Sequence, residues 1–266
     1  MEENYVFPYY MYTSILSEYI SPETLDQIPL FRIAEDLLNI LNSEKQIKLT
    51  QTGALPVKVV VELYNKKYIE SDLIELGYSK LSREEDSIAI RTAKETILMS
   101  GLVKKIHGKL TLTKTGIKLL EKNDRLAIFK KFFLAFTEKF EWSYNDYYPE
   151  FRIGQAEWEY SILLLNFFGD QLLPAEFYAK KYAYRFPNFI NVFPEEYFTT
   201  PIEQYYNCYI VRTFERFFAW FGFVKTITTT NEKKLRNRDL LYKKSDILDK
   251  VFELPEINPA FNFSLN

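Results

Sequence analysis

The chain has 266 residues, a formal net charge of −2, one cysteine and one histidine. It is long enough for two ordinary domains, each able to bury a core without disulfides or a metal. One cysteine excludes an internal disulfide framework, one histidine excludes a multi-histidine metal site, and eight glycines leave little material for a phosphate-binding loop. We therefore predict no cofactor, no metal and no catalytic site, and expect a non-enzymatic protein.

Positive charge is concentrated in a few segments. The count of Lys and Arg minus Asp and Glu is −6 over residues 1–42, +5 over 43–125 and −1 over 126–266. Residues 101–118 hold five lysines and no acid, and residues 225–244 are also basic. Such segments are typical of surfaces that meet phosphate. Exposed hairpins also carry lysine for solubility and to block edge pairing, so both interpretations stay open.

The first elements follow from composition and spacing. We expect residues 1–28 to form an irregular N-terminal arm that is rich in aromatic side chains. Apolar residues three and four apart predict a helix over 29–42, which its first residue, a proline, can open. A short strand is expected over 47–50. The valine-rich segment 57–67 has the composition of a strand, but we predict a helix because the related segment 175–182 is a good helix former.

Two stretches of the sequence align without a gap at an offset of 121 residues. The first begins at Ile90 and the second at Val211, and Arg, Thr, Gly, Val, Lys and Ile recur at the same places. A match at fixed spacing predicts that one structural unit is used twice. Each copy reads as an amphipathic helix that stops at a glycine, Gly101 or Gly222, in a left-handed Schellman motif.

After each glycine the sequence predicts a basic hairpin. The strands are expected at 103–106 with 110–113, and at 224–229 with 240–243. The first hairpin turns at His107 and Gly108. New helices are expected after Thr115 and Ser245, because their hydroxyl groups can cap a helix.

The order helix, strand, helix, helix, hairpin resembles a winged helix. The turn Gly101-Leu102-Val103, followed by a strand that ends in Leu112-Thr113-x-x-Gly116, is similar to the wing of bacterial regulators of the MarR type; the second copy lacks that ending. We therefore predict a mainly α fold with small β-hairpins (α+β) and two winged-helix-like domains in tandem. The first covers 29–125, the aromatic-rich second covers 126–254, and a C-terminal tail covers 255–266.

This resemblance implies that the repeated helix enters the major groove of duplex DNA and that the wing meets the backbone or minor groove. For Arg91 and Arg212 the alternative is a structural role, with the guanidinium paired to a neighbouring acid. The acids at 84–86 suit a helix N-terminus but would repel DNA. The nucleic-acid-binding candidates are Arg91, Lys94, Lys104, Lys105, Lys109, Arg212, Arg216, Lys233, Lys234, Arg236 and Arg238.

The sequence thus predicts a cytoplasmic regulator or accessory protein that binds nucleic acid, in particular duplex DNA. The acidic N-terminal residues do not resemble a secretory signal, and no apolar run approaches the ~18 residues of a membrane span. One alternative is a protein-interaction scaffold or homodimer with the aromatic second half as its interface. Another is a small-molecule sensor with an aromatic pocket in 126–223. We expect most of these rings to fill the core.

Overall fold

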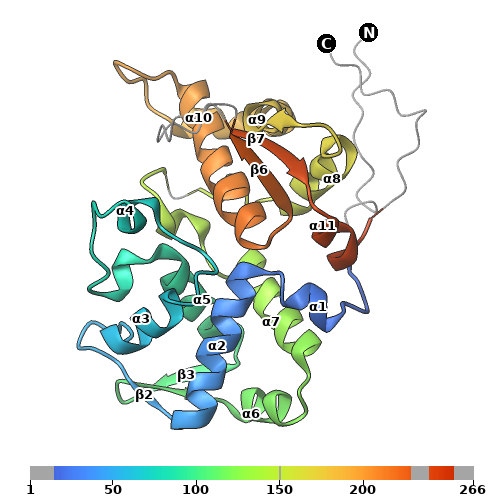
Figure 1. Cartoon of the computed structure of the whole chain (residues 1–266). Coiled ribbons are helices and arrows are strands. Elements are labelled where there is room, and N and C mark those ends of the chain that lie inside the picture. Colours follow the sequence, from blue (N-terminus) through green and yellow to red (C-terminus); the bar gives the residue numbers. More distant parts are fainter. Residues whose placement is uncertain (1–14, 150, 229–239, 255–266) are drawn as a thin grey trace. The chain divides into compact units, whose positions relative to one another are not determined.

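The computed structural model describes residues 15–149, 151–228 and 240–254 (Figure 1). The chain divides into two compact units. The N-terminal unit is Tyr19–Gln155 with Trp220–Gly222, and the C-terminal unit is centred on Ala156–Ala219 and continues from Phe223. Helices predominate, and the strands form small antiparallel sheets. The predicted fold class, mainly α with small β-hairpins, is confirmed.

In the N-terminal unit the predicted helices and strands occur in the predicted order. The arm expected to be irregular over 1–28 is wrong in part, because residues 22–25 form a short helix that Ser21 caps. The segment that begins at Val57 is a helix despite its three consecutive valines, because Val59 and Val60 face the core. The elements are α1 (Pro22–Leu25), α2 (Pro29–Glu44), β2 (Ile47–Lys48), α3 (Val57–Tyr64), α4 (Asp72–Glu75), η2 (Glu84–Asp86), α5 (Ile88–Met99), β3 (Val103–Ile106), β4 (Lys109–Leu112), α6 (Lys114–Glu121), α7 (Arg125–Glu138) and η3 (Trp142–Asn145).

The first sheet has the strand order β2-β4-β3. Strands β3 and β4 are joined by His107 and Gly108, whose φ angles are 49° and 71°. Two positive φ angles are what a type I′ turn needs, and the twist of that turn matches the flanking strands. The predicted hairpin is therefore confirmed, with His107 exposed at its turn.

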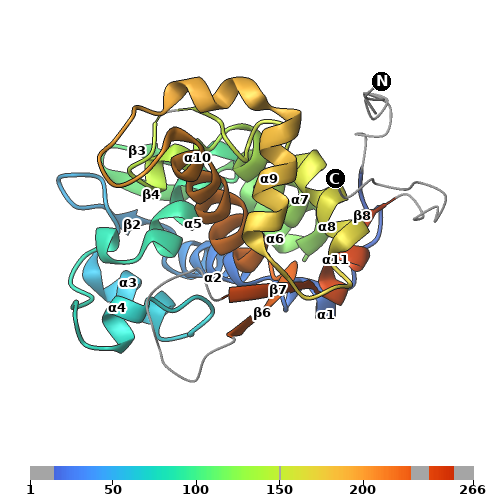
Figure 2. The ribbon, with the colours of Figure 1, turned by 90° about the horizontal axis from the view of Figure 1, so that it is seen from above.

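In the C-terminal unit the second sheet has the order β5-β7-β6, the same as the first. Figure 2 shows β6 beside β7 and α9 beside α10. The order helix, strand, helix, helix, hairpin therefore occurs twice. The elements are β1 (Ile15–Leu16), α8 (Trp158–Phe168), β5 (Leu173–Pro174), α9 (Ala175–Arg185), η4 (Pro187–Val192), α10 (Pro201–Tyr209), η5 (Ile210–Phe218), β6 (Val224–Thr228), β7 (Leu240–Lys244), α11 (Asp246–Val251) and β8 (Phe252–Glu253).

The second repeated helix is longer than predicted and is partly a π-helix. It continues directly from α10, and its part from Ile210 to Phe218 is a π-helix. Phe214, Phe217 and Phe218 are fully buried on it, and the ring of Tyr178 lies 4.9 Å from that of Phe214. The expectation that these aromatic rings fill the core, and do not form an open cage, is confirmed.

Both repeated helices end at a glycine in the left-handed region, as predicted. Gly101 has φ 76° and Gly222 has φ 72°. In the second copy the Phe223 amide donates to the Phe218 carbonyl at 2.8 Å, which is the bond of a Schellman motif. In the first copy a serine hydroxyl bridges the corresponding groups. Ser100 Oγ donates to the Ile97 carbonyl at 2.7 Å and accepts from the Leu102 amide at 3.3 Å.

The helix after the first hairpin begins two residues earlier than predicted. Thr113, and not Thr115, caps α6, because its hydroxyl accepts from the Gly116 amide at 3.1 Å. The same hydroxyl donates to the Gly101 carbonyl at 2.8 Å. Ser245 caps α11 as predicted. The threonine of the Leu-Thr-x-x-Gly motif thus joins the glycine turn to α6.

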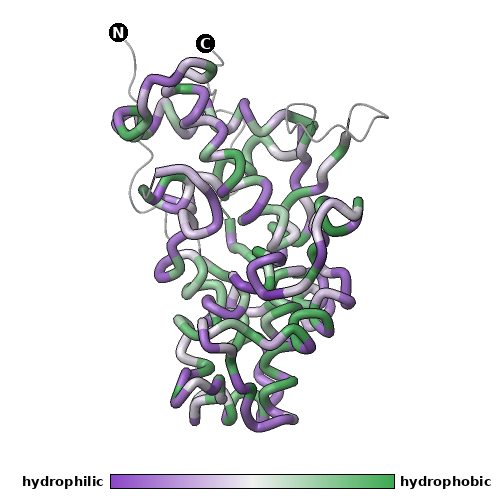
Figure 3. Tube along the Cα trace, turned by 90° about the vertical axis from the view of Figure 1, so that its left-hand side faces the viewer, coloured by the Kyte–Doolittle hydropathy of each residue, from purple (hydrophilic) through white to green (hydrophobic). Residues whose placement is uncertain are grey.

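The boundary between the units falls after Gln155, whereas the sequence suggested residue 125. Helix α7 belongs to the N-terminal unit because its phenylalanines pack against α2; the rings of Phe129 and Phe31 are 5.2 Å apart. Phe132 and Phe133 on the same helix are fully buried. Figure 3 shows hydrophobic and hydrophilic residues alternating along the helices, as such packing requires.

Candidate nucleic-acid interface

The register of the first sheet gathers three lysines on one face. Lys48 lies directly opposite Lys109, which lies opposite Ile106, and Lys104 lies opposite Thr111. Residues that face each other across neighbouring strands point to the same side of a sheet, and successive residues alternate. Lys48, Lys104 and Lys109 therefore share one side, which we call the outer face of the first sheet.

The other side of the first sheet is packed on the core. Its apolar residues are almost fully buried: Ile47, Val103, Leu110 and Leu112. The outer face is consequently turned to solvent, with Lys48 and Lys104 exposed and Lys109 half-buried. Lys48 was absent from the sequence-based candidates, although the alternating stretch at 47–50 had indicated a strand there.

The outer face carries its positive charge without a carboxylate bound to it among the described residues. Among the described residues, none of the three lysines forms an ion pair with an acid. Lys48 and Lys109 are cross-strand neighbours, and like charges in that position destabilise a sheet. A bound anion would offset this repulsion, since one phosphate can accept hydrogen bonds from both ammonium groups.

Lys105 does not belong to the outer face. It lies opposite Leu110 in the register and so points to the inner side. Its Nζ lies against Gly53, where a side-chain atom would collide with it. Lys105 is still exposed, but the alternation of the strand separates this predicted phosphate contact from Lys104 and Lys109.

Lys94 is a buried structural residue, which corrects its prediction as a phosphate contact. Only 3% of the residue is exposed, and its Nζ lies 2.5 Å from Oε1 of Glu84, itself 2% exposed. The other Glu84 oxygen, Oε2, accepts from the Leu55 amide at 2.6 Å. The ammonium group thus neutralises a buried carboxylate and is not available to a ligand.

The acids before α5 also prove to be structural. Glu84 is bound by Lys94, and Asp86 accepts from the backbone amides of Ser82 and Arg83 at 2.7 and 2.9 Å. Only Glu85 of the three is exposed. The repulsion of DNA expected from three carboxylates is therefore reduced to that of one.

Helix α5, which the winged-helix resemblance places in the major groove, is largely covered from Arg91 onward. No residue from Arg91 to Ser100 is fully exposed. Arg91 donates to the Tyr144 carbonyl and to Oδ1 of Asn145, both at 3.1 Å, and Asn145 also donates to Thr92 at 2.8 Å. Arg91 therefore has a structural role, as in the alternative interpretation. This corrects its prediction as a nucleic-acid-binding residue.

The nucleic-acid-binding candidates in the C-terminal unit are buried, half-buried or outside the described residues. Arg212 is 1% exposed and belongs to the core of η5, so its prediction as a DNA contact is corrected. Arg216, on the same helix, is half-buried and engaged in contacts of its own. The second-wing candidates lie outside the described residues: Lys233, Lys234, Arg236 and Arg238.

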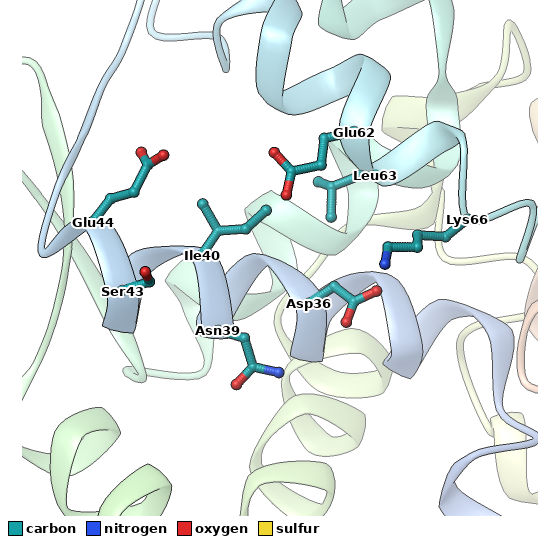
Figure 4. Close-up of a pocket in the computed structure, with 8 residues that line it drawn as sticks. All are labelled: Asp36, Asn39, Ile40, Ser43, Glu44, Glu62, Leu63 and Lys66. Carbon is teal, nitrogen blue, oxygen red and sulfur yellow. The ribbon is translucent and has the colours of Figure 1, made fainter.

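A shallow pocket of about 280 Å³ lies between α2 and α3. Lys66 points toward Asp36 across it, and Glu62 lines it from α3 (Figure 4). The pocket has no aromatic lining and lies outside residues 126–223, so it does not match the aromatic sensor pocket considered from the sequence. None of the predicted site residues lines it.

One family model matches the chain. Residues 26–125 are similar to the Y4jL N-terminal domain. The match spans the first sheet and the helices from α2 to α6. The family description names no ligand or activity, so it carries no functional conclusion. No curated protein and no solved structure matches the chain.

Neither a membrane-spanning helix nor a metal-binding cluster is present in the described parts of the chain. No helix within them is both long and apolar enough to cross a membrane. Residues 15–149, 151–228 and 240–254 also hold no group of three or more His, Cys, Asp or Glu side chains placed to bind a metal ion. Cys208 is fully buried. The strongest candidate site is the outer face of the first sheet, because the register brings three lysines together there.

Proposed function

We propose that the chain binds duplex nucleic acid through the outer face of the first sheet, as a non-enzymatic cytoplasmic regulator or accessory protein. The observation that carries the proposal is the sheet register, which aligns three lysines without acidic partners on one exposed face. In this proposal both units are winged helices, and the wing makes the contact.

The mode of contact is to the phosphate backbone. Lysine ammonium groups bind phosphates as point charges and read no base sequence. Two of the predicted contacts on α5 are instead held inside the N-terminal unit, since Lys94 binds Glu84 and Arg91 binds Asn145. The proposed interaction is thus governed by charge and is largely independent of sequence.

Removal of the three charges should weaken binding strongly. We expect K48Q/K104Q/K109Q to raise the Kd for a short DNA duplex at least about tenfold at moderate salt, because each substitution removes an ammonium group that binds a phosphate. The increase should be similar for duplexes of unrelated sequence. Fluorescence anisotropy with labelled duplexes measures it.

A matched control separates this face from general surface charge. K66Q/K80Q/K131Q removes three exposed lysines of the same unit that lie outside the sheet. We expect its Kd to stay near that of the wild type. Equal weakening by both variants, or none by either, would reject the outer face as the binding surface. In that case solubility and edge protection explain its lysines.

A second candidate function, a protein interface in the aromatic-rich half, is favoured by one loop. Tyr197 and Phe198 are 93% and 89% exposed, with ring centroids 4.8 Å apart. The loop is held in shape, because Thr199 donates to Glu196 at 3.0 Å and Gln204 donates to the Pro194 carbonyl at 2.7 Å. Rigid exposed aromatic side chains are favoured in protein interfaces.

A further inference from the structure

The second sheet carries a lysine pair of its own on its outer face. In β6 and β7, Lys225 lies directly opposite Lys243, and both are exposed. Ile227 shares their face and is 47% exposed. The opposite face is packed on the core through Tyr242, which is 2% exposed and lies with its ring 4.9 Å from Phe214.

This pair is not a copy of the pair in the first sheet. By the repeat, Lys225 corresponds to Lys104, whose partner in the register is Thr111 and not a lysine. Lys243 therefore stands where the first sheet has a threonine. Each sheet thus holds one cross-strand lysine pair on its outer face, at a different row of the register. Because like charges in this position destabilise a sheet, a common anionic ligand is a physical reason for both pairs.

The acids near the second pair are engaged by other lysines. Lys250 binds Asp246 at 2.6 Å, and this hydrogen bond lowers the pKa of Asp246, with a smaller contribution from Lys225. Lys244, on the inner face, binds Asp249 at 3.0 Å. Within the described residues neither Lys225 nor Lys243 forms an ion pair. Asp246 lies near enough to feel the charge of Lys225, but no carboxylate among the described residues binds either ammonium group.

We infer that Lys225 and Lys243 form a second phosphate-binding face, so that one chain can hold two segments of duplex nucleic acid at once. The inference rests on the proposed function, which supplies the first face. The two faces belong to separate compact units, so each is formed by its own sheet and its own core. Two sites on one chain can hold two ligand segments when both sites can be engaged at the same time.

A bridging assay tests this inference. Beads carrying a DNA duplex are incubated with the full chain and then with a second, fluorescent duplex, and the captured fluorescence is measured. We expect the wild type to capture the second duplex. K225Q/K243Q should still bind the bead duplex through the first face, but capture should fall to the level of beads without protein. K66Q/K80Q should capture as the wild type does. Light scattering reports the mass of each variant.

The outcomes separate the two claims. If the wild type binds the bead duplex but captures no second one, the second face is rejected and the proposed function stands. If K225Q/K243Q captures as well as the wild type, bridging arises elsewhere, for example in a dimer seen by light scattering, and the inference is again rejected. If K48Q/K104Q/K109Q/K225Q/K243Q binds a single duplex as well as K225Q/K243Q does, the first face contributes nothing and the proposed function itself fails.

Discussion

Replacement of Lys94 by methionine should lower the free energy of unfolding by about 3–5 kcal/mol, the usual cost of leaving one member of a buried ion pair alone. Lys94 and Glu84 are both almost fully buried, and their charged atoms are 2.5 Å apart. Methionine fills a similar volume but leaves the Glu84 carboxylate without its counter-charge. Urea denaturation followed by circular dichroism measures the loss.

A second substitution tests the cause of that loss. Glu84→Gln combined with Lys94→Met removes both charges, while the glutamine oxygen still accepts from the Leu55 amide. We expect the double variant to recover most of the stability, because the large cost of an unpaired buried charge is removed and only the smaller cost of a buried amide remains. Lys131→Met, on the exposed side of α7, should stay within about 0.5 kcal/mol of the wild type. A loss below about 1 kcal/mol for Lys94→Met would contradict the structural role.

Gly116→Ala should destabilise the chain by about 1–3 kcal/mol through overpacking. A methyl group at this position would overlap the backbone carbonyl oxygen of Leu102. That oxygen cannot easily move, because it accepts from the Thr113 amide at 3.0 Å and from its hydroxyl at 3.1 Å. The last glycine of the Leu-Thr-x-x-Gly motif is thus needed for the close approach of α6 to the turn before β3.

Whether Gly116→Ala lowers or raises the stability of the chain decides between two effects. Gly116 lies within α6, where helix propensity alone would make alanine stabilising by about 1 kcal/mol. Thr115→Ala, at the exposed neighbouring position, is the matched control and should change stability by less than about 0.5 kcal/mol. Thermal unfolding of the three proteins compares them. A rise in stability for Gly116→Ala would show that the close approach does not exist.

Local patterns in the sequence were enough to predict most elements of the fold. Glycine ends the two repeated helices because it alone adopts the left-handed conformation without strain, and this holds at Gly101 and Gly222. The repeat also outweighed the strand propensity of the valines in α3. The domain boundary was missed because the phenylalanines of α7 form a helical pattern whichever unit they pack in.

The candidate site was harder to predict because it depends on contacts between distant segments. Lys48 joins Lys109 only through the pairing of β2 with β4, which a two-residue strand scarcely indicates. Lys94 had a recognisable signal, since it falls on the buried stripe with Ile90 and Ile97. A lysine on such a stripe needs a buried partner, and Glu84 is the nearby acid that serves.

The salt dependence of duplex binding tests the central claim most directly. The claim is that the first sheet holds phosphate through Lys48, Lys104 and Lys109. Three such contacts should contribute about −2.7 to the slope of log K against log salt concentration. We predict that the slope for K48Q/K104Q/K109Q is shallower than that of the wild type by this amount. Equal slopes for the two proteins, or wild-type binding that does not change with salt, would contradict the account.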